Sequence, residues 1–273
     1  MKLQQKTVDR LQSRYGKWAL VTGASSGIGR EIAVALGEAG FNLVICARRE
    51  AILKELSSQL FEKHQVEVIP YAGDLSKEAT VRSLLEETAH LNIGIAILNA
   101  GFGSSGKVLE YDLDNELNMV DLNCRTVLHM ATHYAQAMKA QNQKGAIVLV
   151  SSILGFHGAP FAANYAATKA YVQSLGEGIA RELKPEGIDV LTAAPGPVET
   201  GFASRADMKM GQTQTAEKIA LSIINAIGRK STTIPGFLSK FLAYNLMLVP
   251  RWAKVRIMEK VMGGFTKHQE SNQ

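Results

Sequence analysis

The chain has 273 residues, which allows one large α/β domain or two small ones at roughly 150 residues per domain. Hydrophobic residues make up 46% and charged residues 20%, a balance that excludes a disordered chain or one dominated by membrane spans and predicts a soluble globular protein. The net charge of +5 is concentrated in residues 1–15 and 236–273, so the body lacks the basic face of a nucleic-acid-binding protein.

Apolar β-type segments alternate with segments of helical spacing. The predicted strands are 18–22, 42–47, 66–72, 95–99, 146–151 and 189–193, with a last strand near 232–234. Helical spacing follows residues 27, 52, 76, 164 and 215, with Ser76 and Thr215 as expected N-caps. No linker rich in Pro, Gly or Ser interrupts the series, so we predict a single domain over 1–273. Its expected fold is a doubly wound α/β Rossmann fold, with a parallel sheet of about seven strands and helices on both faces.

Three segments lie outside this alternation: an N-terminal extension at 1–16, a flap over the substrate at 196–214, and an apolar and basic tail at 236–273. An aromatic and basic helix in the tail can lie on an anionic membrane surface, although a subunit interface or a lid over the substrate is favoured over the membrane. The start of the chain has no signal-peptide pattern and no apolar run approaches a span, so we expect a cytoplasmic protein.

Neither the two cysteines nor the histidines form a pattern that predicts a disulfide or a metal site. Cys46 and Cys124 are far apart in sequence within apolar stretches, which indicates buried free thiols. His129, His133 and His157 have no carboxylate or cysteine partners at ligand spacing, so no metal site is expected.

A glycine-rich turn follows the first predicted strand and begins a helix. Glycines let a backbone approach phosphate groups closely, and a helix N-terminus offers free N–H groups and a positive dipole end. The turn is therefore a candidate pyrophosphate site, although an ordinary strand-to-helix connection would have the same glycines. Its residues are Gly23, Ser25, Ser26, Gly27, Ile28 and Gly29.

The end of the second predicted strand decides between two cofactors. An acidic residue about 20 positions after the glycine loop would bind the ribose 2′-hydroxyl of NAD. The sequence instead has Arg48 and Arg49, whose planar guanidinium groups suit a 2′-phosphate. We predict NADP(H), with NAD(H) as the alternative if both arginines are only solvated surface residues.

Tyr165 and Lys169 are four residues apart in a predicted helix, which places them on the same face. An ammonium beside a phenol favours the phenolate, so Lys169 should lower the pKa of Tyr165 and make it a general acid or base. Ser151 and Ser152 end a preceding strand, where a hydroxyl could bind a substrate oxygen. Each of these signals alone is common in proteins.

Taken together and in order, these motifs resemble the short-chain dehydrogenase/reductase superfamily over about residues 18–200. The resemblance rests on the glycine loop, Leu98-Asn99-Ala100-Gly101, Asn123, Ser152, the Tyr165 and Lys169 pair, and Pro195-Gly196. Two positions differ from the usual pattern: Leu98 replaces an asparagine, and Thr126 stands where many members have glycine. The segment 14–19 is similar to the branch that contains hydroxysteroid dehydrogenases and 3-ketoacyl reductases.

The resemblance implies a role for each matching residue. Tyr165 would exchange a proton with the substrate oxygen, Lys169 would assist it and hold the nicotinamide ribose, and Asn123 would hold a water of the proton relay. Ser152, 13 residues before Tyr165, is the expected donor to the substrate oxygen in preference to Ser151. The residues implied to border the cofactor are Asp74 and Leu75 at the adenine, Asn99, Ala100 and Gly101, and Pro195, Gly196, Val198 and Thr200 at the nicotinamide.

The resulting hypothesis is an NADPH-dependent reductase of a carbonyl compound, with a ketone or acyl group on a lipid-like molecule as the expected substrate class. The resemblance also implies a homodimer or homotetramer. Two alternatives remain open: an NADPH-binding sensor or scaffold without turnover, and an NAD-dependent alcohol dehydrogenase.

Overall fold

The computed structural model describes residues 2–209, 211 and 213–272 and contains a seven-stranded sheet within them. The strand order is β3-β2-β1-β4-β5-β6-β9, and every pairing is parallel. This confirms the predicted Rossmann fold. The strands are β1 (Trp18–Thr22), β2 (Asn42–Ala47), β3 (Val68–Ala72), β4 (Ile93–Leu98), β5 (Gly145–Val150), β6 (Ile188–Ala193) and β9 (Thr232–Thr233).

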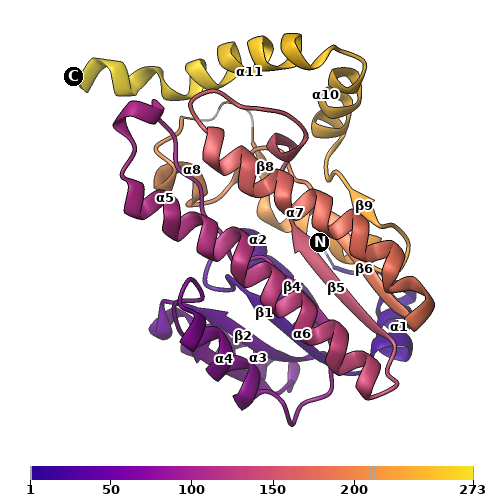
Figure 1. Cartoon of the computed structure of the whole chain (residues 1–273). Coiled ribbons are helices and arrows are strands. Elements are labelled where there is room, and N and C mark those ends of the chain that lie inside the picture. The colour runs from indigo at the N-terminus through magenta and orange to yellow at the C-terminus, as the bar shows by residue number, and fades with distance from the viewer. Residues whose placement is uncertain (1, 210, 212, 273) are drawn as a thin grey trace.

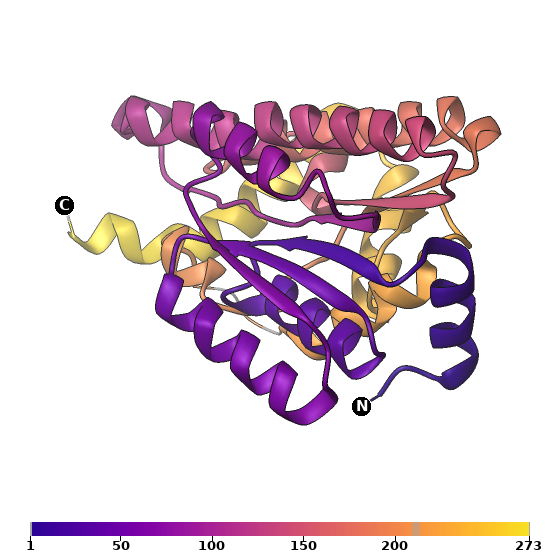
Figure 2. The same ribbon diagram turned by 90° about the horizontal axis from the view of Figure 1, so that it is seen from below.

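Two layers of helices cover the sheet (Figure 2). Alternate strand residues point to opposite faces, as Val21 and Leu20 show by packing in different core clusters. Because both faces are covered, the central strands are apolar along their whole length. One face is packed by α2 (Gly27–Glu38), α3 (Glu50–His64) and α9 (Ala216–Ala226), and the other by α4 (Glu78–Glu87), α6 (Thr126–Ala140) and α7 (Ala163–Glu182).

The N-terminal extension forms a helix, α1 (Gln5–Tyr15), that none of the predicted elements covers. Its apolar face places Leu11 and Tyr15 fully inside the core. The Tyr15 hydroxyl donates to Asp189 Oδ2 at 2.7 Å, and Arg14 pairs with the same oxygen at 2.6 Å. The Tyr15 carbonyl lies so close to Gly94 that a Cβ there would stand 1.5 Å from its oxygen. The extension is therefore packed as part of the domain.

The predicted flap is built from short elements around a turn. They are β7 (Val198–Glu199), α8 (Phe202–Arg205) and β8 (Gln214–Thr215), and β7 pairs in parallel with β8. Positions 210 and 212 of the flap lie outside the described residues. The tail forms α10 (Phe237–Met247), α11 (Arg251–Thr266) and η5 (Lys267–Asn272), beyond the carboxyl ends of the strands (Figure 1).

One predicted helix cap is wrong. Helix α4 begins at Glu78, after Lys77, and has no side-chain cap. The Ser76 hydroxyl instead donates to Asp74 Oδ1 at 2.9 Å, and its N–H donates to the same oxygen at 3.1 Å. Ser76 therefore closes a turn at the end of β3, where a short hydroxyl side chain bonds more readily to a neighbouring carboxylate. Helix α9 begins directly after Thr215, as predicted, but the Thr215 side chain makes no cap hydrogen bond.

The remaining described elements connect these layers: η1 (Val108–Glu110), α5 (Leu113–Val120), the π-helical turn η2 (Asp121–Arg125), η3 (Ile153–Phe156) and η4 (Lys184–Glu186). Among the described helices, none combines the length and apolar character that a membrane span requires.

Candidate active site

The strand order brings the predicted motifs to one edge of the sheet. β2 and β4 pair on opposite sides of β1, so the order reverses direction at β1, and ligands of such sheets bind outside the carboxyl ends of strands at this switch. The loops after β1, β4, β5 and β6 carry the glycine turn, Asn99, Ser152 and Pro195, respectively. The chain therefore gathers residues from four distant segments at one place.

Thr22, which ends β1, ties the first two of these loops together. Its hydroxyl donates to Ile97 O at 3.2 Å and accepts the N–H groups of Asn99 and Ala100 at 2.9 and 3.0 Å. The Asn99 side chain returns a bond to Thr22 O at 3.0 Å. Thr22 opens the glycine-rich run in the sequence, but its role in joining the two loops is visible only once β1 and β4 are paired.

The glycine turn fits a dinucleotide. Gly23 and Gly27 have φ angles of +70° and +58°, which favour glycine. A Cβ on Gly29 would lie 2.4 Å from Gly23 O, so the turn closes only without that atom. Ser26 precedes α2 with no side-chain cap, which leaves the first helical N–H groups available to an anion. These observations support this turn as the pyrophosphate cradle.

The two arginines predicted to bind a phosphate have different surroundings. Arg49 Nη2 donates to Ser25 O at 3.1 Å and to Ser25 Oγ at 2.9 Å, which braces the glycine turn. Arg48 is exposed at the end of β2. Burial lowers the pKa of Arg205 from α8, and the nearby charge of Arg48 lowers it further while Asp74 opposes the shift. Arg48 and Asp74 are thus close enough to Arg205 to influence its charge, and the sequence motifs did not identify Arg205.

Asn123 lies in the π-helical turn and is fully buried. Its Oδ1 accepts from Phe102 N at 3.2 Å, and its Nδ2 donates to Phe102 O at 2.9 Å and to Thr168 Oγ1 at 3.0 Å. Such wide turns within helices are frequent at functional sites. Thr126, one of the two departures from the family pattern, bonds through its hydroxyl to Leu75 O and so holds the loop after β3.

Ser152, Tyr165 and Lys169 meet where β5 ends against α7. All three side chains are buried, and Ser152 Oγ accepts from Leu154 N at 3.2 Å and is hydrogen-bonded to the Tyr165 hydroxyl. Lys169 Nζ donates to Val150 O at 2.9 Å and lies 5.8 Å from the centre of the Tyr165 ring. Ser151 instead donates to Lys169 O at 2.8 Å, so Ser152 is the serine that faces Tyr165.

The pKa of Tyr165 moves in the direction opposite to the expected one. Burial raises it to about 12, against a smaller lowering by the hydrogen bond from Ser152. Burial also lowers the pKa of Lys169 to about 8. The reason is desolvation, which disfavours both the phenolate and the ammonium in this apolar site. Lys169 Nζ donates to the Val150 carbonyl and lies near the Tyr165 ring, and in this position it does not offset the rise in the pKa of Tyr165.

Pro195, Gly196, Val198 and Thr200 run along the same edge. Ile153 N donates to Pro195 O at 3.1 Å, which joins this stretch to the loop after β5. Thr200 contacts the glycine turn, because a Cβ on Gly27 would lie 2.9 Å from Thr200 Cγ2. Gly101, from the loop after β4, is packed between Asn123 and Lys169. These contacts join the loops after β1, β4, β5 and β6 at the carboxyl edge of the sheet.

The flap lies directly on Tyr165. The Phe202 ring centre is 5.2 Å from that of Tyr165, and the Arg205 guanidinium is 4.1 Å from the centre of the Phe102 ring. Tyr165, Phe102, Met208, Met258 and Met262 belong to one apolar cluster that includes residues of the flap and of α11. The surroundings of the tyrosine are thus apolar and are completed by the C-terminal tail.

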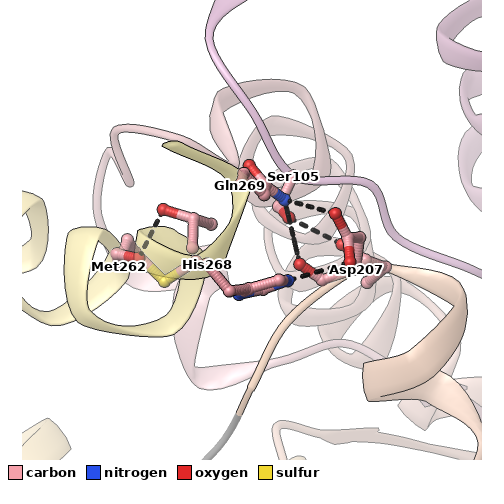
Figure 3. Close-up of polar contacts among 7 residues, drawn as sticks. Ser105, Asp207, Met262, His268 and Gln269 are labelled. Carbon is pink, nitrogen blue, oxygen red and sulfur yellow. Dashed lines mark hydrogen bonds and ion pairs between the residues drawn. The ribbon is translucent and has the colours of Figure 1, made fainter. Parts of the chain in front are cut away.

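A polar cluster joins the flap to the tail (Figure 3). Asp207 Oδ1 lies 2.9 Å from His268 Nε2, and the Gln269 side chain donates to Asp207 Oδ2 at 2.9 Å and to Ser105 Oγ at 3.0 Å. Ser105 in turn donates to Ala206 O at 2.6 Å. This latch connects the loop after β4, the flap and η5. No sequence motif predicts this latch, because its residues come from three segments that are far apart in the sequence.

No cluster of three or more metal-ligating side chains occurs among the residues that the structure describes. Of the two cysteines, Cys46 is buried and Cys124 is half-buried, and both are free thiols.

Comparisons with known proteins agree with this fold and with the predicted family. A family model described as short chain dehydrogenase matches residues 17–211. The 7beta-hydroxysteroid dehydrogenase of Clostridium sardiniense is 31% identical over 189 residues, which cover 69% of this chain and 72% of that protein. The very-long-chain 3-oxoacyl-CoA reductase of Rattus norvegicus is 29% identical over 260 residues, covering 93% of this chain and 81% of the relative.

Solved structures agree with these relatives. One, from work on the stereoselectivity of 7beta-hydroxysteroid dehydrogenase, has a TM-score of 0.83 and 25% identity, and the match covers 91% of this chain and 98% of that one. The short-chain dehydrogenase from Sphingobium yanoikuyae in complex with NADPH has a TM-score of 0.76 and 26% identity, with coverage of 87% and 97%. The chain therefore belongs to the short-chain dehydrogenase family and is an oxidoreductase.

Proposed function

We propose that the protein reduces the carbonyl group of an apolar, lipid-like ketone or acyl compound to an alcohol, with NADPH as the cofactor and Tyr165 as the proton donor. The observation that carries the proposal is the buried Tyr165 hydroxyl, bonded to Ser152 and surrounded by an apolar cluster to which its own ring belongs. A phenol whose pKa is raised to about 12 is protonated at neutral pH, which is the form a general acid needs.

In this proposal Ser152 orients the reacting oxygen. Its Oγ already accepts the Leu154 N–H, so its own hydrogen is available to the Tyr165 hydroxyl or to a substrate oxygen. Lys169, with a pKa of about 8, is mostly an ammonium at pH 7 and favours negative charge at Tyr165 once the proton has left. Asn123 holds the Phe102 backbone and the helix that carries Tyr165 in a fixed relation.

NADPH, when bound, would supply the hydride, and the chain's own residues would bind it. The first turn of α2 and the glycine turn would hold the pyrophosphate. Arg48, with Arg205 beside it, would bind a 2′-phosphate, which supports NADP(H) over NAD(H). Asp74 and Leu75 lie at the adenine end in this arrangement, and Asn99 to Gly101 and Pro195 to Thr200 line the remainder.

The substrate class rests on the cluster around Tyr165. Aromatic, methionine and alanine side chains dominate it, and methionines adapt to apolar ligands of irregular shape. The names of two relatives, a hydroxysteroid dehydrogenase and a very-long-chain 3-oxoacyl-CoA reductase, refer to bulky apolar substrates. We further propose a cytoplasmic homodimer or homotetramer.

The test is NADPH oxidation with a panel of ketosteroids, 3-ketoacyl thioesters, simple ketones and aldehydes. Tyr165→Phe should lower turnover by about 10²- to 10⁴-fold while NADPH binding is retained. If the native protein binds NADPH and turns over nothing in the panel, the sensor or scaffold alternative gains support. The cofactor proposal would be overturned if the native protein bound NADH more tightly than NADPH and Arg48→Ser showed the same preference. That result would favour an NAD-dependent dehydrogenase.

A further inference from the structure

Helix α10 presents large apolar side chains to solvent. Phe237, Phe241, Tyr244 and Leu248 follow each other at intervals of four, three and four residues, so they form one stripe along the helix. Phe237 and Leu248 are 85% and 87% exposed, and Trp252, at the start of α11, is 66% exposed. We call these five residues and the exposed Leu242 the C-terminal apolar face.

The opposite side of α10 packs against the domain through small residues. Ser239 and Ala243 are buried, and Ser239 Oγ approaches Gly196 so closely that a Cβ there would lie 2.2 Å away. Ala243 packs with Ala194 and Ile234. The helix is therefore held by these small side chains and directs the side chains of the C-terminal apolar face outward, the reverse of an ordinary surface helix. An exposed apolar patch of this kind marks an interaction site.

The two helices that carry this face also carry exposed basic side chains. Lys240 on α10 and Arg251, Arg256 and Lys260 on α11 are exposed, and the Arg256 guanidinium lies 5.4 Å from the centre of the Trp252 ring. Glu259 is the single acidic residue in the sequence between 237 and 267. Figure 1 shows α10 and α11 together at one end of the molecule, so the apolar and basic side chains belong to the same end.

We propose that the C-terminal apolar face binds the surface of an anionic lipid bilayer, with the helices lying on the membrane and not crossing it. Tryptophan, tyrosine and phenylalanine beside lysine and arginine are the composition of helices that lie at the headgroup level. A second copy of the chain fits less well, because a symmetric contact would bring the same basic residues of two subunits together. Anionic headgroups are complementary to this charge.

The experiment is sedimentation with sucrose-loaded vesicles made of equal parts phosphatidylcholine and phosphatidylglycerol, or of phosphatidylcholine alone. The full-length protein should bind the mixed vesicles, and binding should weaken as salt is raised. Phe237→Gln combined with Leu248→Gln should lower the binding constant at least tenfold, because two exposed apolar side chains no longer enter the bilayer. Arg251→Glu combined with Lys260→Glu should abolish the preference for the anionic vesicles.

Matched controls separate this surface from general effects. Leu109, 96% exposed, and the exposed Leu113 lie near α5, and Leu109→Gln with Leu113→Gln should bind vesicles as the native protein does. Lys63→Glu with Lys218→Glu is the corresponding charge control. Unchanged NADPH binding and thermal melting would show that each variant is folded.

Three results would overturn the proposal. If the native protein bound both vesicle types equally, charge would have no role in binding. If the α10 double variant bound vesicles as tightly as the native protein, the apolar face would have no role. A change of subunit number in the α10 double variant, without vesicle binding by the native protein, would assign the face to a second copy. None of these readouts depends on turnover, so they are separate from the test of the proposed reductase activity.

Discussion

Replacing Lys169 by methionine should have an effect on stability that depends on pH in a defined direction. Burial lowers the pKa of Lys169 from 10.5 to about 8, so the folded protein disfavours the ammonium. Between pH 8 and 10.5 the unfolded chain binds a proton that the folded chain has released, and the Lys169 contribution to stability rises with pH. The shift corresponds to about 3 kcal/mol at about 1.4 kcal/mol per pKa unit.

The assay is urea unfolding of the native protein and of Lys169→Met at pH values from 7 to 10.5. Because methionine carries no charge, the free energy of unfolding of the variant should exceed that of the native protein most at pH 7. This difference should shrink by about 3 kcal/mol as the pH rises. The lost hydrogen bond to Val150 adds a difference of its own. A free-energy difference that does not change with pH, or that changes in the opposite direction, would refute the reasoning.

The same pKa predicts a fall in carbonyl reduction at high pH. If the ammonium assists Tyr165, kcat/KM should drop about tenfold between pH 7 and 9, as Lys169 loses its charge. Lys169→Arg remains charged over this range, so its residual activity should lack the decline. A decline of equal size in Lys169→Arg would mean that another group titrates.

Three further predictions concern other parts of the structure. Leu11→Ala should lower the free energy of unfolding by about 2–5 kcal/mol in urea titrations, because the Leu11 side chain of α1 is fully buried, and a loss near zero would mean that the packing of α1 does not stabilise the domain. Gly29→Ala should weaken NADPH binding at least tenfold by fluorescence titration, since its Cβ would meet Gly23 O, whereas Gly178→Ala on α7 has open space and should bind normally. Asp207→Asn should speed tryptic cleavage after Lys209, because the carboxylate bonded to His268 holds the flap, and equal cleavage rates would show that the latch does not restrain it.

The alternation of strands and helices along the chain could be predicted from the sequence because the signal is repeated and local. Each central strand is a short apolar run, and each is followed by a helical pattern, so a misplaced boundary does not change the topology. Helix α1 has no such support. Its sequence is mostly polar, and its stability comes from burying Leu11 and Tyr15 against distant segments, which local periodicity does not show.

The candidate site divides in the same way. The pairing of Tyr165 with Lys169 could be predicted from their spacing on one helix face, whereas the choice of Ser152 over Ser151 rests on the family resemblance. The protonation of the Tyr165 and Lys169 pair was not predictable, since the pKa of Tyr165 depends on desolvation by residues such as Met258 from the far end of the chain. Phe202 and Arg205 were missed for a related reason. The flap has no periodic pattern, and its position on Tyr165 depends on contacts with η5.

The packing of the two chain ends affects how shortened versions of this protein should be designed. The family match covers residues 17–211, yet the core is closed by α1 before it and by α9 after it, with Ile219 and Ile223 buried beside α2. A fragment cut at the limits of the match would expose the part of the core that α1 and α9 cover and would leave Asp189 without Arg14 and Tyr15. The segment that matches the family is therefore shorter than the segment needed to form the complete core.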